Sequence, residues 1–551
     1  MLKIISLFIC LVIINVNGYA QSWQWANSGQ GNDFDAVERM TIDKYGNTYV
    51  IGSFYDVLTI DTFHLVSHGF KDVFWAKFDK YGQIVWAKST GGKGNDLPGG
   101  IAVNNSNQVY VFLSFIDTIS DSQFQVRDTG WENDLLLAKY DSSGNLQMYK
   151  TWGSTYRDRG TSITVDNMGH IYLFGAFSDY SGSPAPSVTI DFDGNILNSF
   201  GGRDAFIVKL DSSLITLWAK GAGGLAADFP NKVSIDEDYN VVIVGQAPYG
   251  INFDSIQISD PDLVFFVAKY DSSGNALWAK MATTDLLGSY GISCATGKNG
   301  SVYCAGTYDT PFNISSVSRI KFGNTTLTGD YAFLVKYDAN GNLQWAKNLG
   351  QTARDAAYDI AVDSMDNLYV TGTFNYTGIF GNDTFYTVGH DDIFVNKYDS
   401  NGNHIWTVTA GGVTNDGAYA IALDKDNDIH IGGYISSSPA YFGSYEVSSA
   451  GAWDMCVAKL HQYPTGVPEL SSFTNEVHVY PNPNAGTFLL DYGDKQYEKL
   501  SITDISGREV YHKHISGSTK QQINLNLSDG VYLIRLTGKD QSAVQKFIVQ
   551  H

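Results

Sequence analysis

The chain has 551 residues, with 57 acidic against 36 basic side chains and a formal net charge of −21. This excess of negative charge argues against a nucleic-acid-binding protein, because such proteins present basic surfaces to phosphate. Hydrophobic residues make up 43% of the chain, enough to bury a core, and four cysteines are too few for a disulfide scaffold. The 56 glycines, 12 prolines and 14% aromatic residues favour many strands joined by tight turns, and therefore an all-β protein.

The N-terminus is predicted to be a signal peptide. Lys3 precedes an apolar run from Ile4 to Val16, and the small residues Gly18 and Ala20 follow. This run is shorter than the about 20 residues that cross a bilayer, and no later segment approaches that length. We therefore expect cleavage after Ala20, with residues 1–20 removed, and no transmembrane segment in the mature chain.

Residues 21–461 contain seven copies of one repeat, visible in three columns. The first column belongs to the motif W-A-K or a variant: Trp25, Trp86, Met148, Trp218, Trp278, Trp345 and Trp406. The second is a lysine that ends an apolar run: Lys77, Lys139, Lys209, Lys269, Lys336, Lys397 and Lys459. The third lies in another strand: Tyr49, Tyr110, Tyr172, Val242, Tyr303, Tyr369 and His430. Three columns with one period of 60 to 70 residues indicate a repeat architecture.

Each copy is predicted to form one small sheet of four strands. In the sixth copy the strands are expected near residues 360–362, 368–371, 393–395 and 404–406. Turns of the type D-x-x-G-N join the first strand to the second and the third to the fourth, since Asp, Asn and Gly tolerate the positive φ of tight hairpins. These turns and the segment 191–195 superficially resemble calcium loops, but they lack the twelve-residue frame and terminal glutamate of an EF-hand.

The ends of the repeat series complement each other. Trp25 opens the series without a preceding lysine strand, and Lys459 closes it without a following tryptophan strand. The predicted fold is therefore all-β, a seven-bladed β-propeller followed by a small β-sandwich, in which residues 21–26 complete the blade made by about 416–460. A linear solenoid would need capping repeats, and the sequence contains none.

The repeat resembles a known family. The segment from Asp392 to Trp406 follows the pattern D-x-F-V-x-K-Y-D-x-x-G-N-x-x-W, which resembles the SBBP family of β-propeller repeats over roughly residues 21–462. The sequence departs from this pattern at Met148, Leu214 and Val242. The resemblance implies a fold and says little about chemistry.

A second module follows a linker at 462–475 and occupies residues 476–551. Its short strands and turn signals predict a small β-sandwich. Four spaced segments, V-Y-P-N-P-N-A-G, D-I-S-G-R-E-V, G-V-Y-L-I and K-F-I-V, resemble the C-terminal sorting domain of the type IX secretion system. That resemblance implies export through the periplasm to the cell surface or the medium, with the secretion machinery as partner. It places these residues on the sorting motif: Pro481, Asn482, Pro483, Gly507, Gly530, Tyr532 and Lys546.

An acidic column offers the first candidate binding site. An aspartate recurs ten residues after the tryptophan column: Asp35, Asp96, Asp158, Asp228, Asp355 and Asp416. Around one mouth of a central channel these carboxylates would attract a cation or a basic ligand. The alternative, which we prefer because the position repeats with the fold, is that each accepts hydrogen bonds from the backbone of an adjacent loop.

The remaining polar candidates are few. Cys294 and Cys304 lie on neighbouring predicted strands, where a cross-strand disulfide and a pair of buried thiols are alternatives. His512 and His514 share a strand face, but no third metal ligand is apparent, so we expect surface histidines. No nucleophile, metalloprotease or phosphate-binding motif occurs, and no cofactor or metal is predicted.

The position of any function is predicted from the loops. The connection between second and third strands is long, about residues 54–72 in the first copy, and often contains F-G. Long loops on one rim are where repeat proteins usually bind. The leading hypothesis is a non-catalytic binding or adhesion module for a glycan or protein. The alternatives are a secreted hydrolase, such as a polysaccharide-degrading enzyme with acidic residues at the channel mouth, and a structural surface-layer component.

Overall fold

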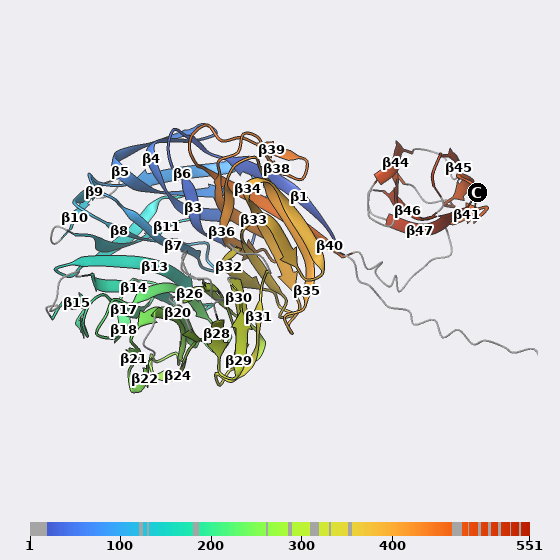
Figure 1. Cartoon of the computed structure of the whole chain (residues 1–551). Coiled ribbons are helices and arrows are strands. Elements are labelled where there is room, and N and C mark those ends of the chain that lie inside the picture. The colour runs from blue at the N-terminus through green and yellow to red at the C-terminus, as the bar shows by residue number, and fades with distance from the viewer. Residues whose placement is uncertain are drawn as a thin grey trace, which may run out of the picture. The chain divides into compact units, whose positions relative to one another are not determined.

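The computed structural model describes most of the chain in two compact units (Figure 1). The described residues are 19–120, 125–128, 132–179, 187–259, 263–284, 289–308, 319–329, 332–350, 355–464, 477–482, 484–493, 497–504, 509–515, 520–528, 530–538 and 542–550. One unit is Trp23–His461, and the other contains Gln462–His551 together with residues up to Ser22. The expected signal peptide, except its last two residues, and the linker, except residues 462–464, lie outside the described residues.

The larger unit is a series of antiparallel sheets, each built around four strands. The sheets of the first three copies contain β3 (Ala36–Ile42), β4 (Thr48–Ile60), β5 (Phe63–Phe78) and β6 (Ile84–Thr90); β7 (Leu97–Val103), β8 (Val109–Phe115), β11 (Asp134–Tyr140) and β12 (Leu146–Trp152); and β13 (Arg157–Val165), β14 (Ile171–Asp179), β17 (Asp204–Leu210) and β18 (Thr216–Gly223). The next three contain β19 (Phe229–Ile235), β20 (Val241–Pro248), β23 (Leu263–Tyr270) and β24 (Ala276–Met281); β26 (Ser289–Thr296), β27 (Val302–Tyr308), β30 (Ala332–Tyr337) and β31 (Leu343–Asn348); and β32 (Ala356–Val362), β33 (Leu368–Phe380), β34 (Asp383–Tyr398) and β35 (His404–Gly412).

The last sheet of this unit combines both ends of the repeat region. Its strand order is β1 (Tyr19–Ser28), β40 (Asp454–Pro464), β37 (Ile429–Ile435) and β36 (Asp416–Leu423). Just beyond β1, the Gly29 N–H donates to the Met455 carbonyl at 2.9 Å. The first strand of the chain therefore pairs with the last strand of the repeat region.

The first strands of all these sheets contact one another in sequence. Each first strand contacts the next one in the order β3, β7, β13, β19, β26, β32 and β36, and β36 in turn contacts β3 (Figure 1). The second and third strands are almost entirely buried, as in β8 and β11, because neighbouring sheets cover both of their faces.

The connection between second and third strands is a compact hairpin and not an irregular loop. Five copies carry a separate hairpin: β9 (Thr118–Ser120) with β10 (Gln125–Arg127), β15 (Thr189–Phe192) with β16 (Asn195–Asn198), β21 (Ile251–Phe253) with β22 (Ile256–Ile258), β28 (Arg319–Phe322) with β29 (Thr325–Thr328), and β38 (Ala440–Phe442) with β39 (Tyr445–Val447). In the first and sixth copies the long strands β4, β5, β33 and β34 form it directly.

The F-G motif of these hairpins serves packing. Phe322, Phe380 and Phe442 are no more than 1% exposed. Strand β21 also pairs with β18 of the preceding sheet, and β38 pairs with β35. Short strands β2 (Gln30–Gly31) and β25 (Thr283–Thr284) pair with β4 and β28, and residues Lys298–Gly300 form a short 3₁₀ helix. Within the described residues, the connections predicted as long loops therefore contain ordered hairpins.

The three sequence columns form one repeated contact between consecutive sheets. The Trp86 indole N–H donates to the carbonyl of Ser142 in the next sheet at 3.3 Å. Lys77 donates to the same carbonyl at 3.1 Å, and its Nζ lies 5.1 Å from the centroid of the Tyr49 ring. Gly144 in that turn lies against the Trp86 ring. The columns are thus packing and capping residues, as their periodic placement predicts.

The smaller unit contains two antiparallel sheets around one core. The first sheet has the order β41 (His478–Tyr480), β42 (Thr487–Asp491), β45 (Lys520–Asn524). The second has the order β44 (Glu509–His514), β43 (Lys499–Asp504), β46 (Gly530–Thr537), β47 (Ser542–Val549). Phe488 and Leu490 of one sheet share a hydrophobic cluster with Ile534 and Phe547 of the other. Within the described residues of the chain, helices long and apolar enough to cross a membrane are absent.

Candidate binding pocket

The structure places the acidic column in the interior, where it holds loops. The six aspartates Asp35, Asp96, Asp158, Asp228, Asp355 and Asp416 are at most 3% exposed. Four of them accept the backbone N–H of the residue four positions earlier, at 2.5 to 3.0 Å: Asp96 from Gly92, Asp158 from Ser154, Asp228 from Gly224 and Asp416 from Gly412. Asp96 also accepts the Ile116 N–H at 3.0 Å. These four carboxylates are therefore buried and bound by backbone N–H groups of the fold.

Each of several junctions between sheets contains a second buried aspartate that the sequence reasoning missed. Asp204 begins β17 and accepts the Phe200 N–H, again four residues earlier, at 2.7 Å. Burial raises the pKa of Asp204 to about 7 although the N–H groups of Phe200, Gly201 and Gly224 stabilise its charge. Gly224 also donates to Asp228, so one N–H serves two carboxyl groups. The signal was present in the sequence, because an aspartate also recurs five residues before the lysine column.

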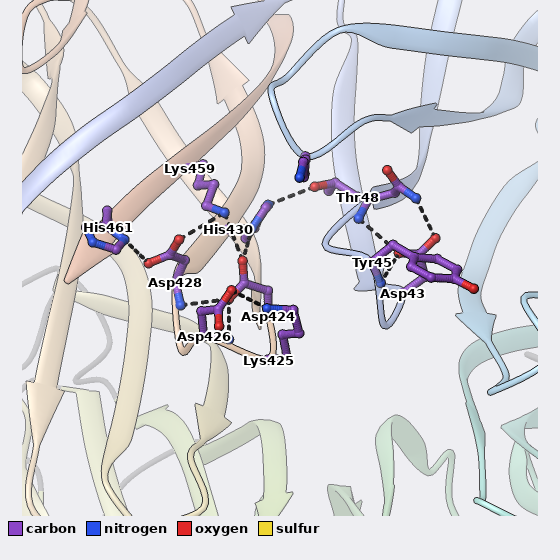
Figure 2. A network of polar contacts seen from close by, with 12 residues as sticks. Asp43, Tyr45, Thr48, Asp424, Lys425, Asp426, Asp428, His430, Lys459 and His461 are labelled. Atoms are coloured by element: carbon purple, nitrogen blue, oxygen red, sulfur yellow. Dashed lines mark hydrogen bonds and ion pairs between the residues drawn. The ribbon is translucent and has the colours of Figure 1, made fainter. Parts of the chain in front are cut away.

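The last sheet carries a buried ionic cluster in place of the usual tyrosine contact (Figure 2). Lys459 Nζ lies 2.8 Å from Asp424 and 2.9 Å from Asp428, and His461 contacts Asp428 from the other side. Burial raises the pKa of Asp424, but hydrogen bonds from His430 and Lys459 outweigh it, so that this pKa lies below its ordinary value. One lysine therefore bridges the two carboxylates.

His430 joins this cluster to the first sheet. Its Nδ1 lies 2.7 Å from Thr48 Oγ1, its Nε2 lies 3.5 Å from Asp424, and its side chain is fully buried (Figure 2). In other copies a tyrosine stands here and donates to the turn aspartate, as Tyr49 does to Asp43 at 3.1 Å. Burial lowers the pKa of His430. The cluster therefore links sheets and offers no open face to a substrate.

An open pocket of about 410 Å³ lies where the first, sixth and last sheets meet. Its lining residues are Phe34, Ala36, Glu38, Arg39, Ser53, Tyr55, Lys71, Tyr358, Tyr419 and Trp453. They come from β3, β4, β5, β32 and β36 and from the residues just before β3 and β40. These positions lie at the strand ends that carry the hairpins and the joins between sheets.

Aromatic rings build one wall of this pocket. The Trp453 and Tyr434 rings are stacked, with centroids 4.0 Å apart and an interplanar angle of 16°. Phe34 meets Trp453 edge-on at 5.3 Å, while Tyr419 contacts Tyr434 at 5.3 Å and Tyr358 at 4.9 Å. These residues occupy none of the three repeat columns. The arrangement breaks the symmetry of the repeat, and sequence reasoning did not find it.

Asp35 of the acidic column holds two of the segments that line this pocket. Its carboxylate accepts the Tyr55 N–H at 3.1 Å, and its own N–H donates to the Trp453 carbonyl at 2.8 Å. Phe34 and Trp453 are joined by a parallel bridge at the same point. The structure thus gives one predicted acidic residue a supporting role at the pocket.

A smaller pocket of about 280 Å³ lies at the opposite, turn-bearing ends of the strands. It is lined by acidic residues including Asp236, Glu237 and Asp363. Asp236 is paired with Lys269 at 2.8 Å, and Asp236 and Asp363 each accept backbone N–H groups of their own turns. Two of its three carboxylates are therefore already engaged in the fold.

The cysteine and histidine candidates have clear positions. Cys294 and Cys304 are direct partners in the β26–β27 register, and the structure has both as buried free thiols, as it does Cys456. The Cys294 Sγ–H donates to the Lys232 and Val242 carbonyls at 3.8 and 3.9 Å. His512 and His514 are exposed. In the part of the chain that the structure describes, His, Cys, Asp and Glu form no group of three suited to a metal ion.

Among the sorting-motif residues that the structure describes, Asn482 binds the backbone of β47. Asn482 Oδ1 accepts the Ile548 N–H at 2.8 Å, and its Nδ2 donates to the Lys546 carbonyl at 3.4 Å. Pro481, Asn482 and Lys546 are exposed, whereas Tyr532 is 5% exposed and stacks on Phe547. Gly530 begins β46. Pro483 and Gly507 lie outside the described residues.

Residues 478–550 match the secretion system C-terminal sorting domain. The resemblance predicted from the four segments is confirmed, and the protein is exported by type IX secretion to the cell surface or the medium. Its sorting domain implies interaction with the secretion machinery.

Relatives of the remaining chain are distant. An uncharacterised WD repeat-containing protein of Acanthamoeba polyphaga mimivirus is 23% identical over 502 residues, which cover 76% of this chain and 35% of that protein. The regulatory protein FlaEY of Caulobacter vibrioides is 29% identical over 210 residues, which cover 36% of this chain and 20% of that protein. The chain thus spans at most about a third of these relatives. A solved structure of unknown function from Dyadobacter fermentans is 10% identical, with a TM-score of 0.35, and the match covers 66% of this chain and 94% of that one.

Proposed function

We propose that Trp23–His461 is a closed seven-bladed β-propeller of SBBP-type repeats, which binds a glycan without catalysing a reaction. Residues 1–20 would act as the signal peptide, 462–475 as the linker and 476–551 as the sorting domain. The contact from β36 back to β3 supports closure, as does the position of β1 in the last sheet. The WD repeat in the name of the mimivirus relative supports a propeller used for binding, since WD repeats form propeller blades.

The junction between the last and first sheets supports closure most directly. Trp25 on β1 donates its indole N–H to the Lys80 carbonyl at 3.3 Å, and Gly82 lies against its ring. This is the contact that Trp86 makes with Ser142 and Gly144 at an internal junction. The junction that joins the two ends of the series is therefore built like the others.

The aromatic pocket carries the functional proposal. Trp453, Tyr419 and Tyr358 offer ring faces and edges, and the hydroxyl, carboxylate and cationic groups of Ser53, Glu38 and Arg39 lie across from them. Sugar rings combine apolar C–H faces with hydroxyl groups, so an aromatic wall beside a few placed polar groups fits them. An exported protein meets polysaccharides at the cell surface, which makes a binding or adhesion role consistent with its sorting domain.

A glycan array probed with the purified chain and its Trp453→Ala variant tests this function. We expect the native chain to bind a restricted set of glycans, and the variant to bind them about fivefold more weakly, because an aromatic contact contributes roughly 1 kcal/mol. Tyr81→Ala, at an aromatic residue that is 68% exposed in a turn remote from the pocket, serves as control. Equal binding by Trp453→Ala, no glycan bound, or cleavage of a bound glycan would contradict the proposal.

A further inference from the structure

Two cations line the pocket together with its aromatic residues. They are Arg39 on β3 and Lys71 on β5, and both are partly exposed. Arg39 Nη1 donates to the Glu38 carbonyl at 2.8 Å, whereas its Nε is buried and has no hydrogen-bond partner in the described structure. Neither cation forms an ion pair with a carboxylate within the described ranges. Both charges are therefore available to a ligand.

Two carboxyl groups next to the pocket, those of Glu38 and Asp35, accept hydrogen bonds from the protein itself. Glu38 accepts the Ser53 hydroxyl at 2.8 Å, which holds its carboxylate on the β4 side of the pocket. Asp35 lies beneath the pocket, and burial raises its pKa to about 8, so that it is largely uncharged at neutral pH. In a chain with a net charge of −21, the lining of this pocket holds two cations and one carboxylate, and Asp33 and Asp391 lie near its tyrosines Tyr55 and Tyr358.

We propose that the ligand of this pocket is an acidic glycan, with a sugar ring on Trp453 and an anionic substituent between Arg39 and Lys71. This inference rests on the proposed function and names the ligand class of the same site. A guanidinium donates two parallel hydrogen bonds to a carboxylate or a sulfate, and an ammonium adds a point charge. Carboxylate and sulfate share this recognition chemistry.

Calorimetric titration with three oligosaccharides of equal length tests the proposal. The probes are an oligouronate, a sulfated neutral-sugar oligomer and the uncharged oligomer of the same sugar. We expect at least one acidic probe to bind tenfold or more tightly than the uncharged one, and its affinity to fall as NaCl rises from 50 to 500 mM. A preference between the acidic probes identifies the anionic group.

Variants assign the effect to the two cations. Arg39→Gln and Lys71→Gln are each expected to weaken the acidic probe by about fivefold or more and to weaken the uncharged probe less, because only the acidic probe loses a charge contact. Trp453→Ala weakens both probes, and Lys80→Gln, an exposed lysine in a turn remote from the pocket, changes neither. Unchanged melting temperatures confirm that the variants fold.

The possible outcomes distinguish this inference from the proposed function on which it rests. Tight binding of the uncharged probe, insensitive to salt and to Arg39→Gln, overturns the acidic preference while glycan binding stands. Equal binding of an acidic probe by Arg39→Gln and Lys71→Gln overturns the assignment to these residues. Failure of every saccharide to bind the native chain overturns the proposed function as well.

Discussion

A turn glycine that lies against a tryptophan adopts a positive φ and also leaves room for the ring. Substitutions at two glycines can separate these roles. Gly82 has φ +86°, and a Cβ there would lie 2.6 Å from the Trp25 ring. Gly194 has a similar φ of +88°, but a Cβ there would meet nothing within 4 Å. We expect Gly194→Ala to cost about 1 kcal/mol through the left-handed backbone alone, and Gly82→Ala to cost roughly 1–3 kcal/mol more through overpacking.

Denaturant unfolding of the two alanine variants measures this difference. Both substitutions introduce the same methyl group at the same backbone conformation, so each serves as the control of the other. Equal losses in the free energy of unfolding would show that the Trp25 contact does not constrain the turn.

The residue columns could be predicted from the sequence, but the pocket could not. Trp86, Lys77 and Tyr49 recur with the repeat, and such periodicity is enough to identify packing residues. Phe34 and Trp453 do not recur, and residues of three different sheets line the pocket. A single sequence states which residues repeat, but it gives no distance between residues that occur once.

At the scale of the element, paired aspartates make the junctions between sheets sensitive to pH. Burial raises the pKa of Asp96, Asp204 and Asp392 to about 7, although backbone N–H groups oppose it and neighbouring carboxyls add to it at Asp96 and Asp392. In the unfolded chain these groups titrate near 3.8. Between pH 4 and 7 the folded state therefore binds protons that the unfolded state has lost.

Stability is consequently expected to fall as the pH rises through this window. The contribution of each raised carboxyl is complete below pH about 4 and is lost above its folded pKa, on the order of a few kcal/mol per group. Thermal unfolding at pH 5 and pH 8 should show the higher melting temperature at pH 5. A melting temperature that rises or stays constant would contradict this expectation.

The Asp204→Asn variant tests how much one junction contributes to this pH dependence. The amide oxygen still accepts the Phe200 N–H, but the group no longer titrates, so the difference in melting temperature between pH 5 and pH 8 should shrink. Asp338→Asn is the control. At that exposed turn, slight burial is outweighed by hydrogen bonds from Asn342 and Asn340, so that the pKa of Asp338 lies below its ordinary value. An unchanged pH difference in Asp204→Asn would remove this junction as the cause.

The hairpins show why the sequence did not predict that these connections form strands. The sequence correctly placed a long connection between second and third strands, which we expected to be a loop. In the structure, buried apolar residues such as Phe322 and Phe442, and in two copies pairing with the preceding sheet, turn that connection into ordered strands. These contacts involve a neighbouring copy, which local patterning cannot represent.

At the scale of the molecule, the two tryptophans of matched junctions distinguish a closed ring from an open stack. Trp25 and Trp86 are both 7% exposed, and both donate to a carbonyl at 3.3 Å in the next sheet. In an open stack the junction of Trp25 would be a terminal contact that frays independently of the rest. In a ring, every junction must open for the unit to unfold.

A closed ring therefore predicts that the two tryptophan variants lose equal free energy of unfolding. Trp25→Ala and Trp86→Ala should each lower the free energy of unfolding by about 3–5 kcal/mol, because each empties a buried site of the same size. Both variants should retain a single cooperative transition followed by circular dichroism and tryptophan fluorescence. A loss confined to an early, partial transition in Trp25→Ala, with Trp86→Ala destabilised globally, would mean that β1 is an appended end strand and that the sheets form an open array.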